Sequence, residues 1–290
     1  MKNISSNNSK PINILTFDIE EWFHCDFISD SSTWSKYETR IHKSTDKILQ
    51  LLDSKNIKGT FFILGWISEN YPEVVKSIYK NGHEIGCHSL YHILVHQMKP
   101  IEFFNDTERA IKSVEDKIGE KIKLYRAPGF SITENIPWAF EILHQLGIEI
   151  DCSVFPADHD YGGFSGYGDS TPSRIRYNGI EIKEFPMNAH KLFNRNIVFS
   201  GGGFFRFFPY YLIKKWTKNS KYVMSYFHPR DFDSEQPILT QLSITRKFKS
   251  YYGLNGAFKK FDKWTDDFKP ISLMQANDLI NWEETKIVTL

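Results

Sequence analysis

The chain is poor in cysteine, with three among its 290 residues, Cys25, Cys87 and Cys152. The number is odd and the three are widely spaced, which excludes a disulfide scaffold and a cysteine-rich metal site. The sequence therefore predicts a protein of a reducing compartment. We expect each thiol to act as a small apolar filler beside its neighbours in the core.

The chain also lacks a run of about 18 apolar residues, so no membrane-spanning helix is predicted. Residues 1–11 are polar and contain no apolar stretch of the kind found in secretory signals. We expect residues 1–11 to be a disordered lead-in, and residues 12–290 to form one folded domain of a cytoplasmic protein.

No charge of one sign dominates, because 36 Lys and Arg balance 35 Asp and Glu and no long basic block occurs. This composition argues against nucleic acid as a partner. No repeat, low-complexity block or linker divides the chain. Aromatic residues are abundant instead, at 16% of the sequence. They are typical of a large core, and also of a cleft that binds sugars.

Strand and helix patterns alternate along the chain. Apolar runs predict strands at 12–15, 60–64, 83–88, up to 125–126, 148–151, 181–186, 221–227 and 271–274. Amphipathic or capped segments predict helices at 44–52, 72–79, 100–118, 134–146 and over most of 237–290, with a long loop at 158–173. Repeated strand–helix units of this length predict an α/β fold with a parallel sheet, either open or closed into a barrel.

Polar side chains stand where these strands end. Three carboxylates, Asp18, Glu20 and Glu21, follow the first strand, and the later strands end near His88, Arg126, Asp151 and His228. The carboxyl ends of parallel strands meet on one face of a sheet, where sites are built. Buried carboxylates need partners, so a metal or a catalytic role would explain the first group, as would a solvated loop.

His88 and His92 are spaced four residues apart. If the segment is helical, both imidazoles share a face and can reach one ion; otherwise they are two ordinary histidines at a helix start. Two histidines and one carboxylate leave open positions for water, which is the pattern of a hydrolytic zinc site. Three further histidines, His24, His83 and His96, are candidates for a supporting or alternative ligand.

Two further strand ends carry groups that can take part in catalysis. The guanidinium of Arg126 can orient a carboxylate through two parallel hydrogen bonds, and the N–H of Gly129 can stabilise an oxyanion. A Pro-Gly turn beside a structural ion pair explains the same residues. His228 is a general-acid candidate if the other strand ends surround it, and an ordinary core histidine if they do not.

Taken in order, these motifs resemble a known family. They are Thr16-Phe17-Asp18-Ile19-Glu20-Glu21, His88-Ser89-x-x-His92, Arg126-Ala127-Pro128, Asp151-Cys152-Ser153 and Phe227-His228-Pro229. The series is similar to that of the NodB-type polysaccharide deacetylases, carbohydrate esterase family 4. The resemblance covers residues 12–282. The C-terminal part is similar to a subgroup found in bacterial exopolysaccharide and surface-glycan loci, through Glu184-Phe185-Pro186, Ser200-Gly201-Gly202-Gly203-Phe204-Phe205-Arg206 and His228-Pro229-Arg230-Asp231-Phe232-Asp233.

The resemblance implies a distorted (β/α) barrel of about seven parallel strands and a single catalytic domain over 12–290. It implies metal-dependent removal of N-acetyl groups from sugars. By position, Asp18 is then the base that takes a proton from the metal-bound water, and Arg126 holds it. His88 and His92 are metal ligands, Gly129 supplies the oxyanion N–H, and His228 protonates the departing amine.

Two departures from the family pattern concern the site. Most members have adjacent aspartates, whereas Asp18 is followed by Ile19, so the third ligand is Glu20 or Glu21. Alternate strand residues share a side, which favours Glu20. The family's fourth motif commonly ends in an Asp-Trp pair that tunes the acid histidine, and here Val154-Phe155 takes its place. Asp151 and Asp231 are the candidates for the partner of His228.

We therefore expect a deacetylase with one divalent ion, Zn²⁺ by the type of its ligands. Its substrate would be an N-acetylated glycan or a lipid- or nucleotide-linked precursor. Two alternatives remain open: a hydrolase of a small cyclic amide on the same fold, in which the loop at 158–173 shapes the pocket, and a non-catalytic sugar-binding protein. The sequence does not name the sugar or the oligomeric state.

Overall fold

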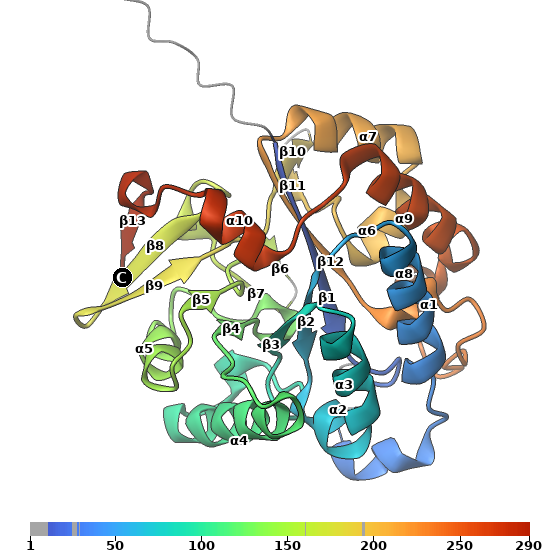
Figure 1. The fold of residues 1–290 in the computed structure, drawn as a ribbon, viewed down its shortest axis with the longest axis horizontal. Helices are drawn as coiled ribbons and strands as arrows, with labels where there is room; N and C mark the ends of the chain where they lie inside the picture. The colour runs from blue at the N-terminus through green and yellow to red at the C-terminus, as the bar shows by residue number, and fades with distance from the viewer. Residues whose placement is uncertain (1–10, 25–27, 29, 160, 193–194) are drawn as a thin grey trace, which may run out of the picture.

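The computed structural model describes residues 11–24, 28, 30–159, 161–192 and 195–290. The predicted lead-in, apart from Pro11, and Cys25 lie outside the described residues. Figure 1 shows a mostly parallel sheet with helices packed around it. Among the described residues, no helix combines the length and the apolar character that crossing a membrane requires.

Nine strands form the main sheet in the order β12-β1-β2-β3-β4-β5-β9-β8-β13. The first seven of them run parallel, β8 is antiparallel to β9, and β13 is parallel to β8. In chain order their bounds are β1 Ile12–Ile19, β2 Thr60–Ile63, β3 Glu84–Cys87, β4 Leu124–Tyr125, β5 Ile150–Asp151, β8 Ser173–Tyr177, β9 Ile180–Glu184, β12 Tyr222–Phe227 and β13 Ile287–Thr289. The predicted α/β fold, a distorted barrel with about seven parallel strands, is confirmed in its strands and helices, but the sheet of the described residues does not close into a full barrel.

Helices connect the strands and cover the sheet. Their bounds are α1 Ile41–Ser54, α2 Gly65–Asn70, α3 Pro72–Lys80, α4 Pro100–Ile118, α5 Trp138–Gln145, α6 Gly202–Phe207, α7 Tyr210–Asn219, α8 Ile244–Tyr251, α9 Leu254–Phe268 and α10 Leu273–Leu279. The longest, α4, begins with Pro100, where a missing N–H costs nothing, and ends at Gly119 with φ of 75°.

Two short antiparallel pairs complete the fold. The pairs are β6 Asp158–His159 with β7 Gly162–Gly163, and β10 His190–Leu192 with β11 Arg195–Ile197. The first lies within the segment predicted to be a loop. The predicted strand at 271–274 is wrong. Ile271 forms only an isolated bridge with Ile14, and the Ser272 side chain accepts from the N–H of Gln275 to begin α10.

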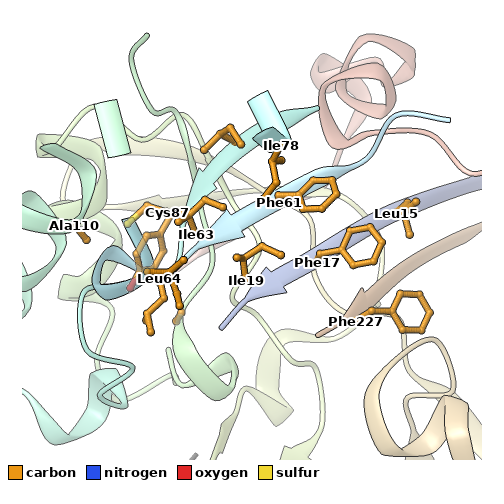
Figure 2. Close-up of a cluster of buried hydrophobic side chains, with 14 of the residues drawn as sticks. Leu15, Phe17, Ile19, Phe61, Ile63, Leu64, Ile78, Cys87, Ala110 and Phe227 are labelled. Atoms are coloured by element: carbon orange, nitrogen blue, oxygen red, sulfur yellow. The ribbon is translucent and has the colours of Figure 1, made fainter. Parts of the chain in front are cut away.

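The strand β1 separates the core from the site. Leu15, Phe17 and Ile19 point to one side, where Phe17 stacks on Phe61 of β2 at 4.7 Å between ring centroids. Figure 2 shows these side chains in one cluster with Phe227 of β12. Because side chains alternate along a strand, the even-numbered residues of β1 face the other side. This alternation places Asp18 away from the main core.

Two of the three cysteines lie among the described residues. Cys87 and Cys152 are buried and free, and burial raises the pKa of both thiols. A thiol held neutral in the core packs as a small apolar group, as the sequence predicts for both.

Candidate active site

The carboxyl ends of the parallel strands surround a cavity of about 580 Å³. Seven predicted site residues line it: Asp18, Glu20, His88, His92, Gly129, His228 and Asp231. They come from the ends of β1, β3, β4 and β12 and the segments that follow. The sequence-based expectation that strand ends converge is met at this cavity.

Glu20, His88 and His92 form a compact cluster in which one ligand atom from each lies within 4.8 Å of the others. His92 Nε2 is 2.9 Å from Glu20 Oε2. His88 Nδ1 lies 2.8 Å from the carbonyl oxygen of Arg126. Because a carbonyl only accepts, that nitrogen carries the proton and Nε2 of His88 keeps a lone pair, as a metal ligand needs.

Charge in the cluster also fits a divalent ion. Burial opposes the charged form of Glu20, but the imidazoles of His92, His228 and His88 lower its pKa below the usual 4.5. Burial lowers the pKa of His88 to about 4, so this ring is neutral at pH 7. Despite burial, Glu20 raises the pKa of His92. Two imidazoles and an ionised carboxylate are the donor set of open zinc sites, so these residues fit the ion that the motifs imply.

The segment between the two histidines is not a helix, the arrangement in which their spacing would put both on one face. Ser89 and His92 have φ of 62° and 56°, which no helix interior tolerates. The Ser89 hydroxyl accepts from the N–H of His92 at 3.2 Å, and Asp106 of α4 accepts from the N–H of Leu90 at 2.9 Å. Side chains therefore satisfy the backbone of a tight loop, and the loop brings the two imidazoles together.

Glu21 has a different environment from Glu20. Its Oε1 accepts hydrogen bonds from the N–H groups of Arg40 and Ile41, at 2.7 and 2.9 Å, where α1 begins. Burial raises the pKa of Glu21 to about 7. The structure thus places Glu20 in the cluster with the histidines and Glu21 at a helix N-terminus, where a carboxylate satisfies free N–H groups.

Asp18 is held by a fully buried arginine. Arg126 Nη1 donates to Asp18 Oδ1 at 2.8 Å and to the hydroxyl of Thr16 at 2.7 Å. The contact is not the predicted bidentate pair, because Nη2 points to Met224 Sδ at 3.0 Å. The guanidinium also lies 4.3 Å from the centre of the Phe62 ring. A guanidinium held by several contacts fixes the orientation of the Asp18 carboxylate.

His228 stands beside the two carboxylates of β1. Its Nε2 is 3.8 Å from Asp18 Oδ2 and 3.5 Å from Glu20 Oε1. Its Nδ1 is 3.1 Å from Oδ2 of Asp231, whose Oδ1 pairs with Arg206 Nε at 3.0 Å. Burial opposes the imidazolium, but the hydrogen bond to Asp231 and the nearby carboxylates raise the pKa of His228 to about 9.

Asp151, the other candidate partner of His228, bonds elsewhere. It accepts from the N–H and the hydroxyl of Ser153, at 3.0 and 2.6 Å, and it lies within hydrogen-bonding reach of Glu184. Burial raises the pKa of both Asp151 and Glu184, and two such carboxyls side by side share a proton. The structure therefore pairs His228 with Asp231.

Glu184 and Arg206 both occur in the motifs given above. Their buried positions and side-chain partners were not predicted from the sequence. Glu184 ends β9 and accepts from the N–H of Val154 at 3.1 Å. Arg206 lies in α6, far along the chain from the strand ends. A buried charge in an aromatic stretch, Phe204 to Phe208, was the one available signal for Arg206, because such a charge needs a partner.

The three histidines named as supporting or alternative ligands lie in different parts of the structure. His24 lines the cavity, and its Nδ1 accepts from the N–H of Glu21 at 3.1 Å, so Nε2 carries the proton of the neutral ring. This Nε2 is buried and has no hydrogen-bond acceptor among the described residues. His83 precedes β3, at the opposite end of that strand from His88, and His96 is exposed. Of these, His24 alone is placed to support the site.

Gly129 takes a conformation that favours glycine. It has φ of 58° in the turn after β4, and a Cβ there would lie 3.0 Å from Leu94 Cδ2 and from Tyr161 Cβ. The glycine thus keeps the cavity wall open beside the cluster.

A family model described as polysaccharide deacetylase matches residues 6–150, half of the chain, and a second, described as a domain of unknown function (DUF3473), matches 152–277. A peptidoglycan-N-acetylglucosamine deacetylase of Bacillus cereus is 36% identical over 98 residues, which are 33% of this chain and 36% of that protein. Chitin deacetylase 1 of Cryptococcus neoformans is 26% identical over 108 residues, 37% of this chain and 23% of that protein. The chain thus spans about a third or less of the length of these relatives.

Solved structures show the same fold at low identity. A provisionally named polysaccharide deacetylase from Mycobacterium smegmatis has a TM-score of 0.66 at 16% identity, over 99% of this chain and 96% of that one. A family 4 pseudoenzyme from Bacillus anthracis has a TM-score of 0.50 at 12% identity, over 96% and 67%. With a family model matching half of its length, this chain belongs to the polysaccharide deacetylase family, the NodB-type carbohydrate esterases of family 4.

Proposed function

We propose that this protein is a metal-dependent hydrolase that removes N-acetyl groups from a sugar in a bacterial glycan or glycan precursor. The observation that carries the proposal is the position of the Glu20, His88 and His92 cluster, beside both Asp18 and His228. Ligands, a base and an acid thus share one cavity. The named activities of the peptidoglycan and chitin relatives support the same reaction class.

Glu20, His88 and His92 would hold the ion, and we expect Zn²⁺ from this donor set. A bound divalent ion would polarise the acetyl carbonyl and make water a stronger nucleophile at neutral pH. Glu20 has the lowered pKa of a carboxylate that stays charged among imidazoles. His88 presents an unprotonated nitrogen, held in place by its bond to the Arg126 carbonyl.

Asp18 and His228 would divide the proton transfers between them. Asp18, held in place by Arg126, takes a proton from the attacking water. His228 is protonated at neutral pH, because Asp231 raises its pKa to about 9, and it gives its proton to the departing amine nitrogen. The N–H of Gly129 is our candidate donor to the oxyanion, from the cavity wall.

The test is acetate release from N-acetylated oligosaccharides by the zinc-loaded protein. We expect Asp18→Asn to lower the rate by about 10² to 10⁴, the usual contribution of a general base, and to leave metal binding intact. Asp116→Asn on the exposed face of α4 is the matched control and should keep full activity. Release that survives Asp18→Asn would refute the mechanism. No release from any acetylated glycan, with metal bound, would favour the cyclic-amide or sugar-binding alternatives.

A further inference from the structure

An aromatic patch, consisting of Phe204, Phe207, Ile244, Phe248 and Tyr252, lies exposed on α6 and α8. Between 43% and 88% of each side chain's surface is accessible. The Phe207 ring lies 6.1 Å from that of Phe248 and 5.8 Å from that of Tyr252, and Ile244 is one helical turn before Phe248. Contiguous exposed apolar groups of this kind mark interaction surfaces.

The helix α8 is held at the surface without burying an apolar face. None of its residues is buried. Its C-terminal carbonyl groups accept from Arg206, with Nη1 at 3.0 Å from Ser250 O and Nη2 at 3.1 Å from Lys249 O. Polar contacts at this end and the partly buried Tyr251 therefore hold the helix, while Ile244 and Phe248 remain exposed.

The surroundings of the patch are strongly basic. Residues 201–221 and 237–253 hold eight of the chain's 36 Lys and Arg and none of its 35 Asp and Glu, so the remainder of the chain carries a net charge of −7. Two of the eight have acidic partners from other segments: the buried Arg206 pairs with Asp231, and Lys214 pairs with Asp267. On α7, Lys214, Lys215 and Lys218 share an exposed face with Tyr211, whose side chain is 69% accessible. Figure 1 shows α6, α7 and α9 on one side of the molecule, next to β12.

This patch adjoins the active-site cavity. The other face of α8 contributes Arg246, Lys249 and Ser250 to the cavity lining, and α6 contributes Gly202 and Arg206. The helix α8 thus stands between the cavity and the exposed Ile244 and Phe248. Anything that binds the patch lies at the rim of the active site.

We propose that the aromatic patch and its basic surroundings bind the surface of an anionic lipid bilayer. Aromatic and aliphatic side chains framed by lysine and arginine are the pattern of helices that lie in the headgroup region. Acidic lipids attract such cations, each contributing about a five-fold gain in binding. A second copy of the chain fits less well, because a twofold interface would place the exposed lysines and arginines of these segments against those of the partner copy.

The position of the patch also specifies a substrate class, a consequence that rests on the proposed deacetylase function. A protein seated through α6 and α8 has its cavity beside the headgroups. Of the candidate substrates, a sugar linked to a lipid is presented there, whereas a nucleotide-linked sugar is not. The N-acetylated substrate is therefore lipid-linked.

The experiment measures sedimentation of the full chain with vesicles of phosphatidylglycerol, and with vesicles of phosphatidylcholine alone. The protein should bind the anionic vesicles, and about 0.5 M salt should release most of it, because screening shortens the reach of the cations. Phe207→Ser with Phe248→Ser should weaken binding by at least about ten-fold. Leu279→Ser, which removes a side chain 68% accessible on α10, is the matched control and should bind as the parent does.

Three results would overturn the proposal: no binding to anionic vesicles, equal binding by the double variant and the parent, or a patch-dependent dimer that ignores vesicles. Thermal melting of each variant establishes that it is folded. A separate arm compares acetate release from an N-acetylated glycolipid in vesicles with release from a soluble N-acetylated oligosaccharide. Faster release from the vesicles, reduced in the double variant, supports the substrate class. Release from neither substrate refutes the deacetylase function, and the sedimentation result still decides the membrane proposal.

Discussion

At the scale of single residues, the partner of His228 decides how this histidine would act as the proposed general acid. The sequence leaves Asp151 and Asp231 open, because both lie near strand ends. The structure shows Asp231 hydrogen-bonded to His228 Nδ1 and Asp151 bonded to Ser153. The family's usual arrangement, with an acid in the fourth motif, is thus replaced by an acid three residues after the histidine itself.

Asp231→Asn should lower the pKa of His228, because it removes the acceptor charge that raises this pKa to about 9. Because the reaction requires protonated His228, the variant then loses activity at a lower pH than the parent does. We expect the basic limb of the pH–rate profile to move down by about 1–2 units. Asp151→Asn is the matched comparison and should leave this limb in place. An unchanged limb in Asp231→Asn, or a shift in Asp151→Asn, would contradict the assignment.

A second residue pair tests the metal cluster. Glu20→Gln should weaken Zn²⁺ binding by more than about 100-fold, since changes outside the ligand set alone cost 10- to 100-fold. Glu21→Gln should retain the metal and lose less than about 1 kcal/mol of unfolding free energy, because an amide oxygen still accepts from Arg40 and Ile41. Isothermal titration and thermal melting measure the two effects. The reverse pattern would make Glu21 the ligand.

At the scale of elements, the sequence predicts most strands and helices and misses those that tertiary contacts create. The expected helix over 100–118 matches α4 at both ends, because Pro100 and Gly119 mark it locally. The short α2, where Gly65 packs against Leu90 and Ala110, and β13, which pairs with β8, carry no such local signals. The loop at His88 takes its shape from Asp106, which is distant in sequence.

Two glycines, one at the start of α6 and one in α9, allow a matched test of how closely α6 packs against β12. A Cβ on Gly201 would lie 1.9 Å from the carbonyl oxygen of Tyr226 in β12, so Gly201→Ala forces strand and helix apart. We expect a loss of about 3 kcal/mol or more in unfolding free energy. Gly256→Ala in α9 meets nothing within 4 Å and should gain about 0.5–1 kcal/mol. Denaturant unfolding measures both, and equal effects would contradict this packing.

At the scale of the whole molecule, the two regions matched by separate family models share one sheet. Strand β12, from the second region, pairs with β1 over six residues, and β9 pairs with β5. The proposed active site draws on both regions, since Glu20 and His88 come from the first and His228 from the second. The order of motifs implies this assembly, but no local pattern shows which strand lies beside β1.

The buried pair of Asp151, at the boundary between the two regions, and Glu184, in the second, makes stability depend on pH. Burial raises both pKa values, so the native pair holds a proton that the unfolded chain releases above about pH 4.5. The contribution of the protonated pair to the unfolding free energy is complete in acid and is lost as the pH rises toward the pKa of the pair in the native protein. Glu184→Gln cannot ionise, so its unfolding free energy relative to the parent should rise as the pH increases above about 4.5, by about 1.4 kcal/mol for each unit by which folding raises the pKa. A relative stability that falls with pH would contradict this account.

The central claim is that Glu20, His88 and His92 hold one catalytic ion for hydrolysis of an N-acetyl group. The most direct measurement adds Zn²⁺ stepwise to chelator-treated protein and follows acetate release from an N-acetylated oligosaccharide or glycolipid. The account predicts a rate that rises in proportion to bound zinc, levels off at one ion per chain, and is absent in Glu20→Gln at any zinc level. Acetate release without metal, or at full rate in Glu20→Gln, would contradict it.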